Sequence, residues 1–428
     1  MMQLSNKQDD HTIVSKTVFL SNNSTSCPAD VDVDATTAED VAGASTPTST
    51  HNSDFDTAGS KSKALNLMMI SCEENPPYGP SKGTAMMFLE LFCQAYERKC
   101  SLREQQQCCS SLLGDCNNNF CNLRIRITIY HAQSNDYPLT SSEWSSYDGI
   151  LIPGSLSAAY DNTNVEWIEK LQSVIRNEIH HMRLKTMGVC FGHQCFAHAF
   201  GRSNHNNEKV EEGCGGEIEG GAGRAIKCPT GSKAGRISSQ LTHEGRQLLV
   251  LDGINSSSSS NSNSDDECSL ELLYTHGDMV QSLPEFAISL GGNANVPIEA
   301  CAYFSSKEDK DLFQKQLRQH QQQQQHHSTT MSTHHHDSGD GDDNTTNDSS
   351  TTVTVQPYAF TFQAHPEYIS PTGFNINYIN TVQAMEDRGY ITQQVSKEAC
   401  EDARVNFWKV QEDSLDAMIA VATALGWF

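Results

Sequence analysis

The chain of 428 residues could hold two or three domains, but only 37% of its residues are hydrophobic, which points to a smaller folded core. Its net charge of −24 argues against nonspecific binding to nucleic acid, because no basic stripe is present to neutralise phosphates. It has no run of about 18 apolar residues, so a membrane span is not expected.

Three segments lack the large apolar residues that a packed core needs. They are residues 1–63, 253–267 and 305–352, which are rich in Ser, Thr, Asp, Asn, Gln or His. Such compositions cannot bury enough apolar surface to offset the entropy of ordering the chain. The sequence therefore predicts a disordered segment, 1–63, followed by one folded domain, 64–428, with low-complexity insertions at 253–267 and 305–352.

Fifteen cysteines could indicate disulfides in a secreted protein. The first residues lack the apolar core of a secretion signal and many cysteines have apolar neighbours, so we expect reduced thiols in a cytosolic protein. The loose cysteine cluster at 100–121 has no regular C-x-x-C pair, which favours a cysteine-rich loop over a zinc site. The histidine tract at 320–336 is best explained as part of a low-complexity insertion. We expect no metal site.

In the first half of the domain, strand patterns alternate with helix patterns. Apolar runs or strict alternation predict strands at 65–71, 123–130, 148–153 and 184–189. Apolar residues at helical spacing predict helices around 85–92 and over 168–182. This order is typical of an open α/β sheet with mostly parallel strands, flanked by helices. In such sheets reactive groups gather outside the carboxyl ends of the strands.

After about residue 200 the pattern changes to shorter β-like segments. They lie at 270–274, 286–290, 298–304 and 357–363. One helix over about 397–427 is expected to close the chain. The folded core is thus one α/β domain that the low-complexity insertions interrupt.

Cys190 stands between Gly188 and Gly192, where a predicted strand meets a predicted helix. G-x-C-x-G at such a junction is the cysteine form of a nucleophile elbow, a tight turn that exposes the nucleophile. The helix dipole and unpaired N–H groups there favour a thiolate, and the N–H of Phe191 would point toward an oxyanion. A buried cysteine in a glycine-flanked turn is the alternative.

A second motif, QAHPEY, places His365 just past another predicted strand, with Glu367 two positions later. A nucleophilic cysteine needs a base, and the base needs a group that holds its tautomer. His365 and Glu367 can supply both. His-Pro-Glu alone is a weak signal, but together with GVCFGHQ upstream it predicts a catalytic site.

GVCFGHQ and QAHPEY resemble the two signatures of the class I glutamine amidotransferase family, the Cys-His-Glu type. The similarity is greatest to its free-standing branch, which includes plant γ-glutamyl peptidases and fungal relatives similar to the amidotransferase domain of GMP synthase. Residues 148–168 are similar to the family's oxyanion loop and following helix, and YTHGDMVQSLP resembles its (S/T/M)HGDxVxxLP segment. The resemblance covers most of 65–428 and implies a flavodoxin-like, three-layer fold.

The resemblance also implies roles for the reacting groups. Cys190 would be the nucleophile, His365 the general base and then acid, and Glu367 its orienting partner. The backbone N–H groups of Gly154 and Phe191 would bind the oxyanion. The family often has Gly-Gly-Pro or Ser-Gly-Ser at the oxyanion loop; here a proline precedes the glycine, which keeps the donor that matters.

Four further residues would lie near the bound glutamyl group: Gln194, His276, Gly277 and Asp278. His276 could orient the substrate loop or be a hydrogen-bonded structural histidine. His193, beside the elbow, is expected to turn aside with its helix. The segment 203–230 is longer and richer in glycine than is usual in the family, which bears on substrate access.

The implied reaction is hydrolysis of a γ-glutamyl amide, either glutamine or a γ-glutamyl peptide such as a glutathione conjugate, through a thioester on Cys190 and without a cofactor. No GxxxxGK[ST] loop for ATP is present, so a synthetase that uses the ammonia would be a separate partner. One alternative is therefore a glutaminase subunit for such a partner. Another is a noncatalytic binding or scaffold protein, because long acidic and Gln/His-rich segments suit interactions.

Overall fold

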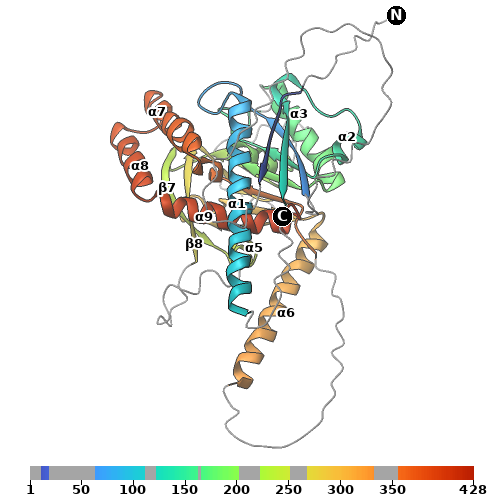
Figure 1. The fold of residues 1–428 in the computed structure, drawn as a ribbon. Helices are drawn as coiled ribbons and strands as arrows, with labels where there is room; N and C mark the ends of the chain where they lie inside the picture. Colours follow the sequence, from blue (N-terminus) through green and yellow to red (C-terminus); the bar gives the residue numbers. More distant parts are fainter. Residues whose placement is uncertain are drawn as a thin grey trace, which may run out of the picture.

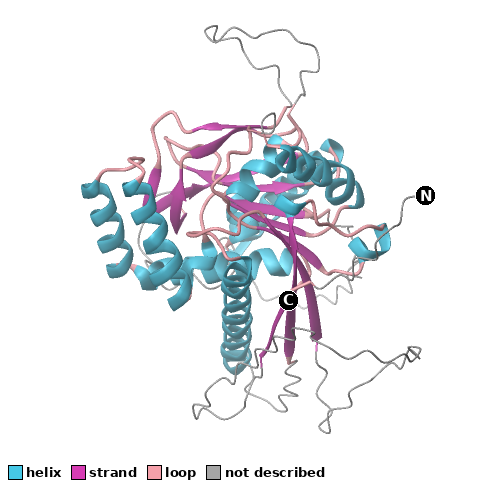
Figure 2. Ribbon diagram, turned by 90° about the horizontal axis from the view of Figure 1, so that it is seen from above, coloured by secondary structure: helices cyan, strands magenta, loops and turns pink. Residues whose placement is uncertain are grey.

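The fold is a large mixed sheet with helices on both faces (Figures 1 and 2). The computed structural model describes residues 11–18, 63–110, 122–161, 165–201, 222–250, 268–331 and 355–428. Within these ranges the strand order of the sheet is β1-β3-β2-β4-β5-β12-β11-β10-β7-β8, and β6 and β9 form a separate two-stranded sheet. No helix in the described ranges is both long enough and apolar enough to span a membrane.

The bounds of the elements follow the chain. The strands are β1 (Ile13–Val18), β2 (Lys63–Ser71), β3 (Leu123–His131), β4 (Gly149–Ile152), β5 (Thr186–Val189), β6 (Arg224–Lys227), β7 (Lys233–Leu241), β8 (Ser269–His276), β9 (Asp278–Ser282), β10 (Ala287–Gly292), β11 (Ala300–Tyr303) and β12 (Ala359–Phe362). The α-helices are α1 (Ser81–Ser110), α2 (Ser141–Ser145), α3 (Glu166–Val174), α4 (Phe191–His198), α5 (His243–Leu249), α6 (Lys307–Met331), α7 (Ile379–Asp387), α8 (Gln393–Val405) and α9 (Phe407–Ala424).

The centre of the sheet is parallel. Strands β3, β2, β4, β5 and β12 pair in parallel, so their carboxyl ends meet at one edge. Antiparallel strands extend the sheet on both sides, β1 beside β3 and β11, β10, β7 and β8 beyond β12. The predicted open α/β sheet flanked by helices is confirmed.

Each face of the sheet has its own apolar core. Along β2, Leu65, Leu67 and Met69 pack into a cluster with residues of α1 and α9. The alternate residues Met68 and Ile70 pack on the opposite face with residues of α3 and α4. Because successive side chains of a strand point to opposite faces, the continuous apolar run of β2 is buried on both sides.

Two elements lie inside segments that the sequence predicts to be disordered. Strand β1 pairs with β3, and Val14 and Val18 are buried in the core, because residues an even number of positions apart in a strand lie on the same face. Helix α6, which extends from the body of the molecule in Figure 1, packs Phe313 on Phe304 with ring centroids 5.0 Å apart. Residues 253–267 and most of 1–63 lie outside the described ranges, so the domain boundary at 64 stays a prediction.

The single closing helix predicted over 397–427 is wrong in detail, because two helices occupy this region. Helix α8 ends and α9 begins around Asn406, whose ψ of 17° departs from helical geometry. The side-chain amide of Asn406 donates to the side chain of Asp402, and this bond stabilises the end of α8. Strands β6, β7 and β9 are not predicted from the sequence, because polar residues make up half or more of each strand and leave little apolar signal.

Candidate active site

Cys190 sits in a strained turn between β5 and α4. Its φ of 52° and ψ of −104° are unusual for a residue with a side chain, and such backbone costs about 1–3 kcal/mol. The Cys190 N–H donates to the Phe362 carbonyl of β12 at 2.7 Å, which fixes the turn against the neighbouring strand. The thiol is therefore held at the carboxyl edge of the parallel strands, the position expected for a reactive group in this architecture.

The two glycines around Cys190 are required by close contacts. A Cβ on Gly192 would lie 2.1 Å from the carbonyl oxygen of Ile152 in β4. A Cβ on Gly188 would lie 2.9 Å from the Thr361 side chain and 3.1 Å from the Gly192 carbonyl group. Both glycines therefore allow α4 to start directly against the sheet with the cysteine at the bend.

His365 and Glu367 form a buried pair just after β12. The His365 Nδ1 lies 2.7 Å from the Glu367 Oε1, and its backbone N–H donates to the Leu273 carbonyl at 2.8 Å. Since the carboxylate can only accept, Nδ1 carries the proton and the carboxylate orients the ring. The His365 Nε2 is buried and has no hydrogen-bond partner among the described residues, so it remains available to a reacting group.

The charge on His365 is set by two neighbours. Burial favours the neutral imidazole, but the Glu367 carboxylate and Cys190 outweigh it and raise the pKa of His365 to about 10. The Cys190 turn is bonded to Phe362, three residues before His365, and Cys190 also contributes to the pKa of His365, so the two side chains lie close together. The structure thus brings together the three residues that the sequence predicts to be catalytic.

Two tyrosine rings stack on the imidazole of His365. Tyr368 stacks on the imidazole with ring centroids 4.4 Å apart and planes inclined by 5°. Tyr78 stacks with it as well, at 5.7 Å and 20°. The Tyr78 hydroxyl donates to the Thr275 carbonyl at 3.0 Å. The sequence alone does not point to Tyr78; its one signal is an aromatic residue in a Pro/Gly-rich loop that follows a buried strand.

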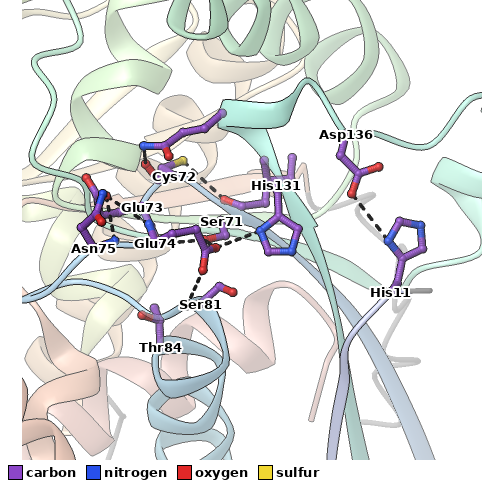
Figure 3. A network of polar contacts seen from close by, with 12 residues as sticks. His11, Ser71, Cys72, Glu73, Glu74, Asn75, Ser81, Thr84, His131 and Asp136 are labelled. Carbon is purple, nitrogen blue, oxygen red and sulfur yellow. Dashed lines mark hydrogen bonds and ion pairs between the residues drawn. The ribbon is translucent and has the colours of Figure 1, made fainter. Parts of the chain in front are cut away.

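The loop of residues 72–80, which carries Tyr78, is held by a polar network at the ends of β2 and β3 (Figure 3). The Glu74 carboxylate contacts three groups: the Ser71 hydroxyl, the Ser81 N–H and the His131 Nδ1. Glu73 accepts from the N–H groups of the next two residues. The Thr84 hydroxyl of α1 donates to the Tyr78 carbonyl. These bonds fix the path of the loop up to Tyr78.

Gly154, one of the two predicted oxyanion donors, lies beside the rings of His365 and Tyr78. A Cβ on Gly154 would be 3.2 Å from both the His365 Cε1 and the Tyr78 Cε1, so the loop after β4 approaches the imidazole closely. Phe191 is the first residue of α4. Neither backbone N–H donates to any residue in the described ranges. Both are therefore available to a bound group.

A cavity of about 280 Å³ opens at Cys190. The predicted substrate residues Gln194, His276, Gly277 and Asp278 all line it, which brings them together with the cysteine. Other lining residues come from the 72–80 loop, the loop after β4, strand β6 and helix α7.

Hydrogen bonds among these residues converge on Asp278. The Gln194 Nε2 donates to the Asp278 carbonyl at 3.1 Å, and the His276 Nδ1 does so at 2.7 Å. Burial lowers the pKa of His276 to about 4, so the ring is neutral and its Nδ1–H holds the turn between β8 and β9. The Tyr160 hydroxyl donates to the Asp278 Oδ1 at 2.7 Å. The carboxylate is thereby fixed at the cavity wall.

His193 turns away from the cavity, as expected. Its Nδ1 lies 2.7 Å from the Thr361 hydroxyl, and burial lowers its pKa to about 3. Among the described residues, no group of three or more His, Cys, Asp and Glu side chains could hold a metal ion. Most of the cysteine cluster at 100–121 and of the histidine tract at 320–336 falls on residues or side chains that the structure does not describe.

The chain is similar to known proteins. The family model for glutamine amidotransferase class-I matches residues 108–386, well over half of the chain. The chain is 29% identical over 158 residues to γ-glutamyl peptidase 5 of Arabidopsis thaliana, a match that spans 37% of this chain and 49% of that protein. It is 32% identical over 108 residues to γ-glutamyl peptidase 4 of the same plant, across 25% of this chain and 39% of the relative. These matches span half of the relatives' length or less.

Among solved structures, a glutamine amidotransferase from Thermotoga maritima aligns with 84% of this chain and 98% of its own. The sequence identity is 11% and the TM-score is 0.45.

Proposed function

Because this chain belongs to the class-I glutamine amidotransferase family, we propose that it hydrolyses γ-glutamyl amides through a thioester on Cys190. One observation carries the proposal: a strained cysteine at the carboxyl edge of the sheet lies beside the buried His365–Glu367 pair. A nucleophile, a base and a group that orients the base are the parts that covalent acyl transfer needs.

In the first step the Cys190 sulfur attacks the side-chain carbonyl of the γ-glutamyl group. The carbonyl oxygen becomes an oxyanion, which the N–H groups of Gly154 and Phe191 would bind, each supplying about 3–4 kcal/mol. The tetrahedral intermediate then collapses and the C–N bond breaks. Protonated His365 gives its proton to the departing nitrogen, which leaves as ammonia or an amine.

In the second step water hydrolyses the thioester. The His365 Nε2 takes a proton from the water as it attacks, and the C–S bond breaks to release glutamate and the Cys190 thiolate. Glu367 holds the Nδ1 proton throughout, so the ring keeps one orientation in both steps. The names of the plant relatives, γ-glutamyl peptidases, favour hydrolysis of a peptide-like γ-glutamyl bond.

The test is glutamate release from glutamine and from γ-glutamyl dipeptides by the purified protein with no partner added. We expect Cys190→Ala to reduce kcat by about 10³-fold or more, whereas Cys400→Ser, which changes a half-buried thiol on α8, keeps full activity. Thermal unfolding of both variants shows whether the fold is intact.

The same assay separates the alternatives. Activity that appears only after a synthetase fraction is added would indicate an ammonia-delivering subunit. If the wild type is inactive and a glutamine-like chloroketone labels Cys190 no faster than Cys400, the catalytic proposal is wrong and a binding role is favoured.

A further inference from the structure

One face of helix α7 forms a wall of the cavity at Cys190. The cavity-lining residues Thr381, Ala384, Met385 and Arg388 are spaced i, i+3, i+4 and i+7, which places them in one stripe along the helix. The stripe begins with small and apolar side chains and ends, at the last turn of α7, with a guanidinium group. It is a surface suited to a molecule with an apolar body and a negative charge at one end.

The Arg388 side chain is exposed at the end of α7. Its guanidinium makes no hydrogen bond or ion pair with any residue in the part of the chain that the structure describes. The acidic side chain next to it, Asp387, bonds instead to Gln383 at 3.0 Å. An exposed cation without a partner beside a cavity is free to bind an anionic ligand.

Another part of the cavity lining carries two charges that complement a glutamyl head group. Asp278 of β9 pairs in register with Lys227 of β6, and both residues line the cavity. A carboxylate beside an ammonium group complements the α-ammonium and α-carboxylate of a γ-glutamyl substrate. Arg388, on a separate element, is a cationic group that the glutamyl head does not need.

From these observations we propose that the α7 face is a leaving-group subsite and that Arg388 is a specificity-determining residue. It selects γ-glutamyl amides whose amine leaving group carries an apolar body and a carboxylate, that is, γ-glutamyl amino acids or peptides with a free C-terminus, over glutamine. This inference rests on the proposed function. A local cation matters because the chain as a whole has a charge of −24, which repels acidic substrates.

The first experiment compares γ-glutamyl-phenylalanine with its C-terminal amide, two substrates that differ only in the carboxylate. We expect the wild type to favour the acid by roughly tenfold in kcat/KM, since a charge-assisted hydrogen bond contributes about that factor. Arg388→Gln should bring the ratio close to one, and Arg388→Lys should restore part of it. The matched control is Arg246→Gln, which removes an exposed cation from α5, outside the cavity lining.

The second experiment measures binding without turnover. Calorimetry of the Cys190→Ala protein, with and without Arg388→Gln, gives the Kd of each ligand even if the wild type proves inactive. A preference for the acid that Arg388→Gln abolishes would support the subsite, whether or not the protein hydrolyses these ligands. Equal binding of both ligands, no binding of either, or a preference that survives Arg388→Gln would overturn it. Hydrolysis of both substrates with no effect of Arg388→Gln would leave the proposed function intact and remove only the subsite.

Discussion

The phenol ring of Tyr78 stacks on the imidazole of His365, 287 positions later in the sequence, with ring centroids 5.7 Å apart and planes inclined by 20°. The contact joins the loop after the first central strand to the residue after the last. Tyr368 stacks on the same imidazole, with ring centroids 4.4 Å apart. The proposed base is thus positioned by two rings and one carboxylate.

Replacing Tyr78 should therefore affect catalysis through the position of His365. Tyr78→Ala removes the ring and should lower kcat/KM by roughly 10²-fold, the effect of misplacing a catalytic group by about 1 Å. Tyr78→Phe keeps the ring, loses only the hydrogen bond to Thr275, and should have a smaller effect. The pH profile of kcat should shift in Tyr78→Ala but not in Tyr147→Phe, a change at a tyrosine whose ring packs on Tyr130 instead. An unchanged rate and profile in Tyr78→Ala would refute the positioning role.

The charge of His365 should depend on Glu367. Glu367→Gln removes the carboxylate that raises the pKa of His365 but leaves the burial that lowers it, so the pKa should fall from about 10. NMR of protein with labelled histidine can follow this proton directly. If His365 titrates at the same pH in both proteins, the Glu367 carboxylate does not raise its pKa.

The raised pKa of His365 predicts how the free energy of unfolding changes with pH. The folded-state pKa of His365 lies above the value of about 6.5 for an unfolded histidine, so proton binding stabilises the fold. This contribution is complete below about pH 6.5 and is lost as the pH rises toward 10. The free energy of unfolding of the wild type, relative to Glu367→Gln, should accordingly decrease across that interval in urea titrations.

How much of the site the sequence reveals depends on the kind of signal each residue leaves. Cys190 and His365 stand in motifs at the ends of apolar strands, where pattern and chemistry coincide, so both could be named from the sequence. Tyr78 and Arg388 carry no such signal. A tyrosine in a loop and an arginine at a helix end are common, and only the packing of α7 and of the 72–80 loop around the cavity makes them neighbours of the cysteine.

The strands likewise differ in how clearly the sequence predicts them. Strands buried on both faces, such as β2, were predicted because long apolar runs are rare by chance. Strands at the edges or in the small second sheet, such as β1 and β6, have few apolar residues and depend on a partner strand for their stability. The composition of β1 alone carries no information about its partner strand, so the sequence predicts disorder there.

The elbow predicts a sharp contrast between two glycine substitutions. Gly192→Ala places a Cβ 2.1 Å from the Ile152 carbonyl oxygen, a contact that only a backbone shift can relieve. We expect a loss of several kcal/mol in the free energy of unfolding, about 2–4, together with slower alkylation of Cys190. Gly83→Ala, within α1, meets no atom within 4 Å and should stabilise the protein by about 0.5–1 kcal/mol. Equal effects of the two substitutions in chemical denaturation would show that the close approach of α4 to β4 is not required.

Strand β1 should contribute to the stability of the fold, although it lies in a segment whose composition predicts disorder. Val14 and Val18 are 4% and 3% exposed, and they pack into the core beside β3, whereas Ser15 between them is exposed. Replacing both valines with alanine should lower the free energy of unfolding by about 2–4 kcal/mol, since each loses two buried methyl groups. Ser15→Ala should change it by less than about 0.5 kcal/mol. Hydrogen exchange can check the pairing independently: the amides of β3 that bond to β1 should exchange faster in the double variant, and identical exchange rates and stabilities in all three proteins would mean that this segment contributes nothing to the sheet.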